Sequence, residues 1–198
     1  MGRFNRIFIL LIVFVMIYGC TLKTPHMVNS DYSTKGTKRI AILPVSNNTD
    51  NTKAGQILRE MVLTELYFKG YPKIPLNIID EKLSKIYKEN NYLKMVTIPP
   101  KTIGELLGVD AVLYVTMEQC STSFAFMYAP THVSAFFELR SAKTGETLWS
   151  ARHKTVKRNY GISQGQLQME SCQVYEPAMQ EVVSTAMKTL PDGPDSVS

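Results

Sequence analysis

The sequence predicts a single α/β domain in which helices pack on a mixed β-sheet. Of the 198 residues, 44% are hydrophobic and 20% are charged, which is typical of one globular domain. Apolar runs of strand length also alternate along the chain with stretches that have one apolar helical face. The expected element order is β-α-β-α-α-β-β-β-α, which favours helices packed on a sheet of mixed direction.

The amino-terminal segment is predicted to be an export signal. Two arginines precede an unbroken apolar run at residues 7–17, whereas a membrane-spanning helix needs roughly 20 such residues. The run ends in Ile-Tyr-Gly-Cys, which resembles a bacterial lipobox, in which the cysteine is acylated and becomes the first residue of the mature chain. We therefore expect residues 1–19 to be a lipoprotein signal peptide and Cys20 to carry the lipid. Thr21, rather than Asp, resembles the sorting signals that favour the outer membrane.

The first elements of the domain follow a polar segment. Residues 20–37 are rich in Thr, Ser, Lys and Asn and lack apolar periodicity, so we expect a flexible tether. Residues 39–44 then form a short apolar run that predicts a buried strand. Apolar residues recur at three- and four-residue steps from about 52 to 69, which predicts an amphipathic helix that ends at Gly70.

Prolines shape the next part of the chain. Pro72 and Pro75 would remove ladder donors from a central strand, so only residues 76–79 are predicted as a strand, near a sheet edge. A short helix is predicted from Asp80 to about residue 91, and another at residues 102–107, where a Pro pair precedes it and a Gly follows it.

The second half of the domain is predicted to be mainly strands. Residues 110–117 form a long run with several β-branched side chains and almost no charge, which is typical of a central strand. Residues 133–139 and 147–156 are expected to form strands joined by a turn at Gly145. Residues 166–190 are expected to form the last helix.

These elements place the domain at residues 38–190. Pro177 is expected to interrupt the last helix, because proline lacks the backbone N–H that a helix interior uses. Residues 191–198 are polar and are expected to be a disordered tail.

Composition and motifs exclude several classes of function. The formal charge is +5, and it falls to +3 when the signal peptide with its two arginines is removed, which is too small to indicate a nucleic-acid partner. Three Cys and three His lack the spacing of a zinc site, so we expect no metal and no cofactor. Residues 161–165 match the GxSxG pattern of hydrolases, but a charged segment precedes them and no His follows. We therefore expect the protein not to be an enzyme.

An aromatic stretch is the main candidate for an interaction site. Phe124, Phe126 and Tyr128 alternate with smaller residues, so a strand here would present one aromatic face. Three interpretations are open: a partner-binding or dimerising edge, one hairpin of a pore formed jointly by many subunits, or a face covered by the carboxyl-terminal helix.

The two cysteines that remain after acylation of Cys20 form a candidate disulfide. Cys120 follows the strongest predicted strand, and Cys172 lies near the start of the last helix. An even pair in an oxidising compartment favours a bridge. The alternative is that one or both are small buried apolar residues.

Three motifs in this order resemble known envelope proteins. Residues 39–49 (RIAILPVSNNT), 108–114 (GVDAVLY) and 143–149 (KTGETLW) resemble the amino-terminal domain of TolB and the curli-secretion lipoprotein CsgG. They are most similar to an uncharacterised family of bacterial lipoproteins related to both. The resemblance spans about residues 38–156 and implies a TolB amino-terminal-domain-like fold without catalytic residues.

The resemblance also implies a location and a role. It implies a domain anchored at the outer membrane on its periplasmic face that works through protein contacts in envelope transport or secretion. We expect a lipid-anchored interaction module whose partners are the membrane, through the lipid, a second copy in a homodimer, and transport or secretion proteins. The alternative is a subunit of a CsgG-like secretion pore, although that subunit contributes two membrane hairpins and this chain offers one candidate.

Overall fold

The computed structural model describes residues 24–30, 32, 36–49, 53–90, 98–161 and 163–196, with the backbone alone at 86–90, 164 and 166–174. The predicted signal peptide and Cys20 lie outside these residues.

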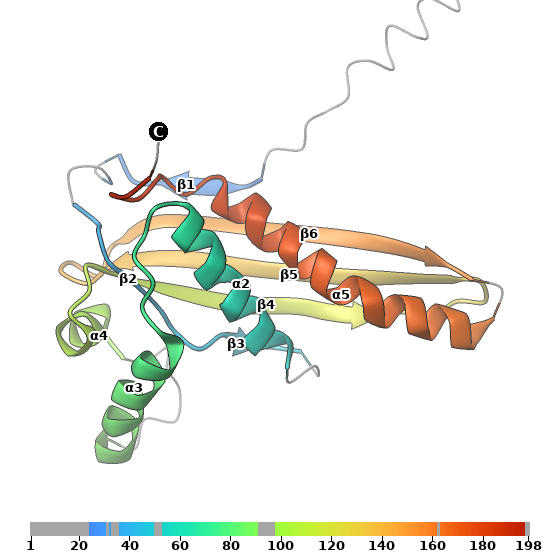
Figure 1. Ribbon diagram of the computed structural model, residues 1–198, viewed down its shortest axis with the longest axis horizontal. Helices are drawn as coiled ribbons and strands as arrows, with labels where there is room; N and C mark the ends of the chain where they lie inside the picture. Colours follow the sequence, from blue (N-terminus) through green and yellow to red (C-terminus); the bar gives the residue numbers. More distant parts are fainter. Residues whose placement is uncertain are drawn as a thin grey trace, which may run out of the picture.

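A six-stranded mixed sheet forms the centre of the domain (Figure 1). The strand order is β1 (His26–Val28), β6 (Thr147–Tyr160), β5 (Tyr128–Ser141), β4 (Ala111–Thr122) and β2 (Ile40–Ile42), and β3 (Ser46–Asn47) also pairs with β4. β2 and β3 run parallel to β4, whereas the other neighbours are antiparallel. The predicted fold class, one domain with a mixed sheet and packed helices, is confirmed.

Helices cover both faces of the sheet near β2. They are α2 (Ala54–Phe68), α3 (Leu76–Asn90), α4 (Pro100–Leu107) and α5 (Gln164–Met187). Because side chains alternate along a strand, Ile40 and Ile42 join the core with α2 and α5, whereas Ala41 joins the core with α3 and α4. None of the helices in the described ranges combines the length and apolar composition that a membrane crossing requires.

Two structural predictions that were based on prolines are wrong. Residues 76–79 form the first turn of α3 rather than a strand, because the Pro75 carbonyl accepts hydrogen bonds from the N–H groups of Ile78 (3.1 Å) and Ile79 (3.3 Å). Pro177 lies inside α5, which continues past it as one helix. The turn after Pro177 is held by packing, since Ala178 and Val182 are fully buried. By contrast, α4 ends as predicted, at Gly108 with φ of 67°.

The predicted tether is wrong at residues 26–30 and at Tyr32. The exposed strand β1 pairs along β6, with His26 opposite Ala151 and Val28 opposite Trp149. Tyr32 is buried, its hydroxyl lies 2.6 Å from that of Tyr71, and burial raises the pKa of Tyr32 above its ordinary range. An edge strand gains its stability from backbone pairing, so it needs no apolar pattern of its own.

The predicted disordered tail is wrong at residues 191–196. Gly193 N–H donates to the Lys69 carbonyl (2.6 Å), and Asp195 N–H donates to the Gly70 carbonyl (3.1 Å). A Lys69–Asp192 ion pair of 2.6 Å joins the same two segments. The last carbonyl groups of a helix have no hydrogen-bond partners within that helix. N–H groups of the tail are the partners of the carbonyls just after α2.

The close approach of this tail predicts a large effect for Gly70→Ala. A Cβ on Gly70 would lie 2.2 Å from the Ser196 backbone nitrogen, at a φ of +83°. Gly145→Ala is the matched control, because Gly145 has a φ of +75° and nothing within 4 Å of its Cβ position. We expect Gly70→Ala to lower the free energy of unfolding by about 1–2 kcal/mol more than Gly145→Ala, since the tail must also move. Urea unfolding of both variants measures the difference, and equal losses would contradict the tail contact.

Candidate interaction surface

Three long strands extend the sheet beyond its core. β4, β5 and β6 have 12, 14 and 14 residues, whereas β2 has three. We call residues 116–122, 128–136 and 152–160 the distal sheet. One of its faces packs under α5, where Ala129, Thr131 and Val133 are fully buried. In Figure 1, α5 crosses the sheet toward the end where β4 and β5 are joined.

Polar contacts hold α5 on the covered face. Glu181 of α5 accepts hydrogen bonds from Lys157 Nζ and from Thr155 Oγ1 (2.7 Å). Thr122 Oγ1 donates to the Tyr175 hydroxyl (2.8 Å). The hydrogen bond from Lys157, and then that from Thr155, lowers the pKa of Glu181. These side chains fix the helix on β4 and β6 over part of the distal sheet.

The lowered pKa of Glu181 predicts a pH dependence of stability. A carboxyl group whose pKa is lower in the folded chain stabilises the fold above its unfolded pKa, here about 4.5, and loses that contribution as the pH falls below it. We expect Glu181→Gln to lower the thermal midpoint at about pH 7 and to have less effect at about pH 4. Calorimetry at both pH values tests this, and an unchanged difference would contradict the ion pair's role.

The other face of the distal sheet, which we call the open face, carries exposed and half-exposed side chains that belong to neither core cluster. These are Thr116, Glu118 and Ser121 of β4, Tyr128, Pro130, His132 and Phe136 of β5, and Arg152, Lys154, Val156, Arg158 and Tyr160 of β6. Arg152 lies 2.9 Å from Glu118 and stacks over the Phe136 ring at 5.0 Å. Ser134 Oγ donates to Glu118 (3.0 Å). These contacts order side chains across all three strands.

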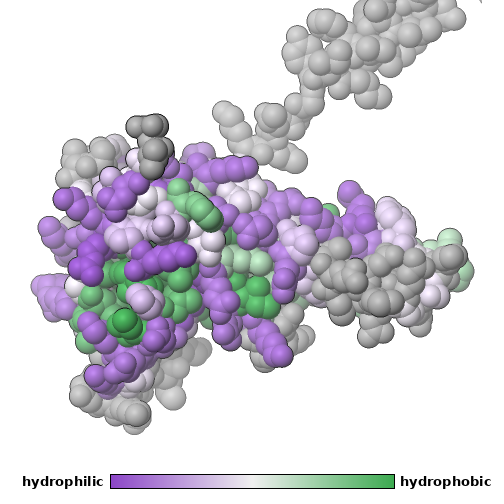
Figure 2. Space-filling view, in the orientation of Figure 1, coloured by the Kyte–Doolittle hydropathy of each residue, from purple (hydrophilic) through white to green (hydrophobic). Residues whose placement is uncertain are grey.

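The open face ends at an exposed aromatic turn. The hairpin tip consists of residues 123–127 together with Tyr128 and Tyr160, whose rings lie 5.2 Å apart. Exposed fractions are 53% for Phe124, 91% for Phe126 and 49% for Met127. Figure 2 shows hydrophobic atoms at the far right end of the molecule, where Figure 1 places the joined ends of these strands.

The aromatic residues are placed differently from the prediction. Phe124 and Phe126 lie in the turn between β4 and β5 rather than on one face of a strand, because Ala125 and Tyr128 exchange backbone hydrogen bonds of 2.8 and 2.6 Å. Their exposure also excludes the interpretation in which the last helix covers them. Only Tyr128 is part of a strand, as the first residue of β5. An interface at these residues stays a prediction.

The cysteine prediction stays open. Cys120 lies in β4 and is buried, and burial raises the pKa of its thiol. Cys172 lies in α5, within the part whose side chains the structure does not describe. The proposed disulfide between them therefore stays a prediction, as does acylation of Cys20. Within the described ranges, no group of three or more His, Cys, Asp or Glu residues is arranged to hold a metal ion.

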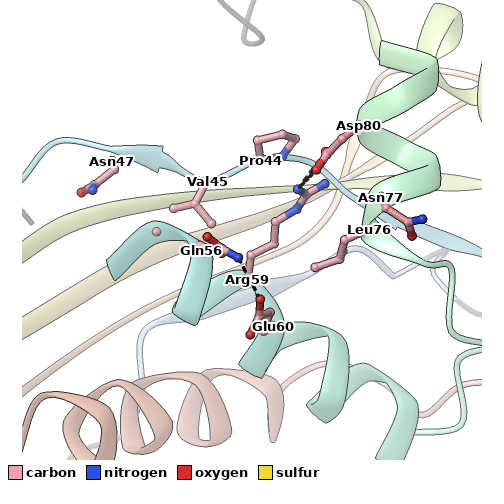
Figure 3. A pocket seen from close by; sticks show the side chains of 10 residues that line it. Pro44, Val45, Asn47, Gln56, Arg59, Glu60, Leu76, Asn77 and Asp80 are labelled. Carbon is pink, nitrogen blue, oxygen red and sulfur yellow. Dashed lines mark hydrogen bonds and ion pairs between the residues drawn. The ribbon is translucent and has the colours of Figure 1, made fainter. Parts of the chain in front are cut away.

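A concave surface lies at the carboxyl end of β2. It is a cavity of about 510 Å³ between α2 and α3 (Figure 3). Arg59 reaches from α2, donates twice to the Ile42 carbonyl (2.8 and 3.2 Å) and pairs with Asp80 on α3 at 2.8 Å. The guanidinium is therefore committed to joining β2, α2 and α3. Arg59 was not predicted as a buried residue, because a charged residue beside an apolar stripe is typical of a solvated helix flank.

Comparison with known proteins identifies relatives of the chain. It is 24% identical over 131 residues to a Neisseria meningitidis serogroup B protein named "Putative lipoprotein NMB1124/NMB1162", which is 65% of this chain and 59% of that protein. The chain thus spans less than two thirds of that relative's length.

Two solved structures are similar in fold. The crystal structure of lipoprotein GNA1162 from Neisseria meningitidis matches with a TM-score of 0.55 and 24% identity, covering 69% of this chain and 94% of that one. A PelC dodecamer from Paraburkholderia phytofirmans matches with a TM-score of 0.50 and 14% identity, covering 82% and 97%. The family described as "Putative lipoprotein GNA1162-like" matches residues 29–194, and the chain belongs to this family.

Proposed function

We propose that this protein is a lipid-anchored, non-enzymatic interaction module on the periplasmic face of the outer membrane, accessory to an envelope transport or secretion assembly. Membership of a lipoprotein family supports the anchor, together with the lipobox that ends at Cys20. The resemblance of residues 39–49, 108–114 and 143–149 to TolB and CsgG supports the role in transport or secretion.

The open face is the observation that carries this proposal. It offers Arg, Tyr and Phe side chains, which are enriched in protein interfaces. Arg152, Glu118 and Phe136 are already held against one another, so a partner binding there would lose little side-chain entropy. The open face carries charged side chains as well as aromatic rings, which suits a partner surface that is partly polar and partly apolar.

Self-association is the interaction that we propose first. The PelC structure with a similar fold is a dodecamer, which supports the use of this fold in assemblies of identical chains. We propose a homodimer in which the open faces of two copies meet, with the transport or secretion protein as a further partner. A pore subunit of the CsgG type would instead form large rings in detergent.

Site-specific photo-crosslinking in cells tests the proposal. A photoreactive residue replaces Lys154 or Arg158 on the open face of the full-length protein, and the control replaces Glu81, an exposed residue of α3. We expect discrete adducts from both open-face positions and none from Glu81, with the homodimer giving an adduct of twice the chain mass. Adducts from neither open-face position, or equal labelling from the control, would overturn the proposed contact.

A further inference from the structure

The hairpin tip contains a residue that neither packing nor backbone geometry explains. Phe126 is 91% exposed, so its ring contributes little to the core. Its φ is +27°, on the side of the Ramachandran plot that favours glycine and that is uncommon for a bulky residue. A large aromatic side chain held in this conformation in full contact with water points to a function outside the fold.

Side chains are layered along the axis of the distal sheet. Phe124, Phe126 and Met127 lie outermost, in the turn. Tyr128 and Tyr160 pair directly behind them, at the last register position of β5 and β6. Exposed cations follow on β6, with Arg158 opposite Pro130 and Lys154 opposite Ser134. Apolar residues, then tyrosines, then cations is the order of an element that enters the surface of a lipid bilayer.

The described chain begins on the side of β1 that faces the hairpin tip. β1 is antiparallel to β6, so the chain that precedes His26 leads toward the hairpin tip. The Pro25 carbonyl accepts a hydrogen bond from Arg152 N–H (3.1 Å), which fixes the start of the described chain beside the middle of β6. Cys20, the expected lipid attachment point, precedes Pro25 by five residue steps.

The segment from Cys20 to Pro25 is shorter than the outer part of β6. Five residue steps lead from Cys20 to Pro25 and span at most ~17 Å when fully extended. Eight residue steps lead from Arg152 to Tyr160, which is ~26 Å along a strand. When the distal sheet points at the membrane and the five steps are fully extended, Tyr160 lies ~9 Å past the level of the anchored cysteine, which fits the ~5–10 Å depth at which interfacial apolar side chains lie.

From this geometry we propose that the hairpin tip inserts into the surface of the phospholipid bilayer that holds the lipid anchor, as a second point of attachment. The inference rests on the proposed lipid-anchored location. With two attachments, the distal sheet stands upright on the membrane, and its open face is presented sideways to partners in the plane of the bilayer. Lipid is the occupant of residues 123–127, whereas a second copy of the chain meets the open face behind them.

Tryptophan fluorescence of the full-length acylated protein tests the proposal. The protein is reconstituted in vesicles of phosphatidylethanolamine and phosphatidylglycerol, with Phe126→Trp as the probe. Phe68→Trp is the matched control, because Phe68 is 76% exposed at the end of α2, in the other half of the molecule (Figure 1). The native Trp149 is fully buried and gives the same background in both variants.

We expect lipids brominated near the head group to quench the Phe126→Trp probe by about two-fold more than the Phe68→Trp probe, and vesicle attachment to shield only the former from iodide. In a second pair, Phe124→Trp is quenched by the same lipids, and adding Phe126→Asp removes that quenching. Both positions are more than half exposed, so these substitutions leave the fold intact.

Flotation of the same vesicles separates the two proposals. If the protein floats but the Phe126→Trp probe stays accessible to iodide, the tip inference is overturned and the anchor stands. If the probe is shielded from iodide without quenching by brominated lipid, a protein covers the tip and the inference is likewise overturned. If the protein does not float, both the lipid-anchored location and the tip insertion are overturned.

Discussion

Replacing Trp149 with alanine is expected to lower the free energy of unfolding by about 3–5 kcal/mol. Trp149 is fully buried in β6, and its ring lies 6.4 Å from that of Phe137 on the neighbouring strand. Its indole N–H donates to Thr189 Oγ1 at 3.1 Å, beyond the end of α5. Alanine would leave a cavity where β1, β5, β6 and the carboxyl-terminal segment meet.

Urea unfolding measures this loss against two comparison variants. Trp149→Phe should cost less than Trp149→Ala, because it keeps most of the ring and because Thr189 Oγ1 also donates to the Ala186 carbonyl (2.7 Å). Phe68→Ala, at a side chain that is 76% exposed, should change stability by no more than about 0.5 kcal/mol. A similar loss for Trp149→Ala and Phe68→Ala would contradict the assignment of Trp149 to the core.

The second large effect is expected at the ion pair of Arg59 and Asp80. The Arg59 side chain is 7% exposed and the Asp80 side chain 49% exposed. Asp80→Ala would leave a buried guanidinium with the Ile42 carbonyl as its main partner, and we expect a loss of about 2–4 kcal/mol. Arg59→Met would leave a carboxylate that water already reaches, and we expect a smaller loss of about 1–2 kcal/mol.

The test is which of the two single substitutions lowers the free energy of unfolding more. A double-mutant cycle with Asp80→Ala, Arg59→Met and the double variant measures both, and the double variant should be more stable than Asp80→Ala alone. This result follows because the second substitution removes the buried charge that the first one leaves unpaired. A larger loss for Arg59→Met than for Asp80→Ala would show that the hydrogen bonds to Ile42 matter more than the ion pair.

Short sequence patterns correctly predicted the elements that are specified by residues close together in the chain. The apolar face of α2, the Gly108 that ends α4 and the β-branched run of β4 are all visible within short windows of sequence. Elements that depend on distant partners were missed. β1 is an exposed strand that pairs with residues more than 120 positions away, and the segment at 191–196 is held by the end of α2.

At the candidate site, too, residue composition was informative, whereas the arrangement of the residues depended on distant parts of the chain. Composition drew attention to Phe124, Phe126 and Tyr128, but their alternation predicted a strand where the chain turns. No local signal shows that residues 123–127 close a hairpin or that Phe124 and Phe126 stay exposed at its end. The open face was also not predicted as a surface, because which strand face is covered depends on where α3, α4 and α5 pack.

Native mass spectrometry of the full-length protein, extracted from membranes of its host, tests whether it is a lipid-anchored interaction module. We expect chains that begin at Cys20, carry acyl groups and occur in complexes with a second chain. Lys154→Glu combined with Arg158→Glu, on the open face, should release monomers with the acyl mass unchanged. Unacylated chains that retain residues 1–19, or acylated monomers as the only species of the wild-type protein, would contradict it.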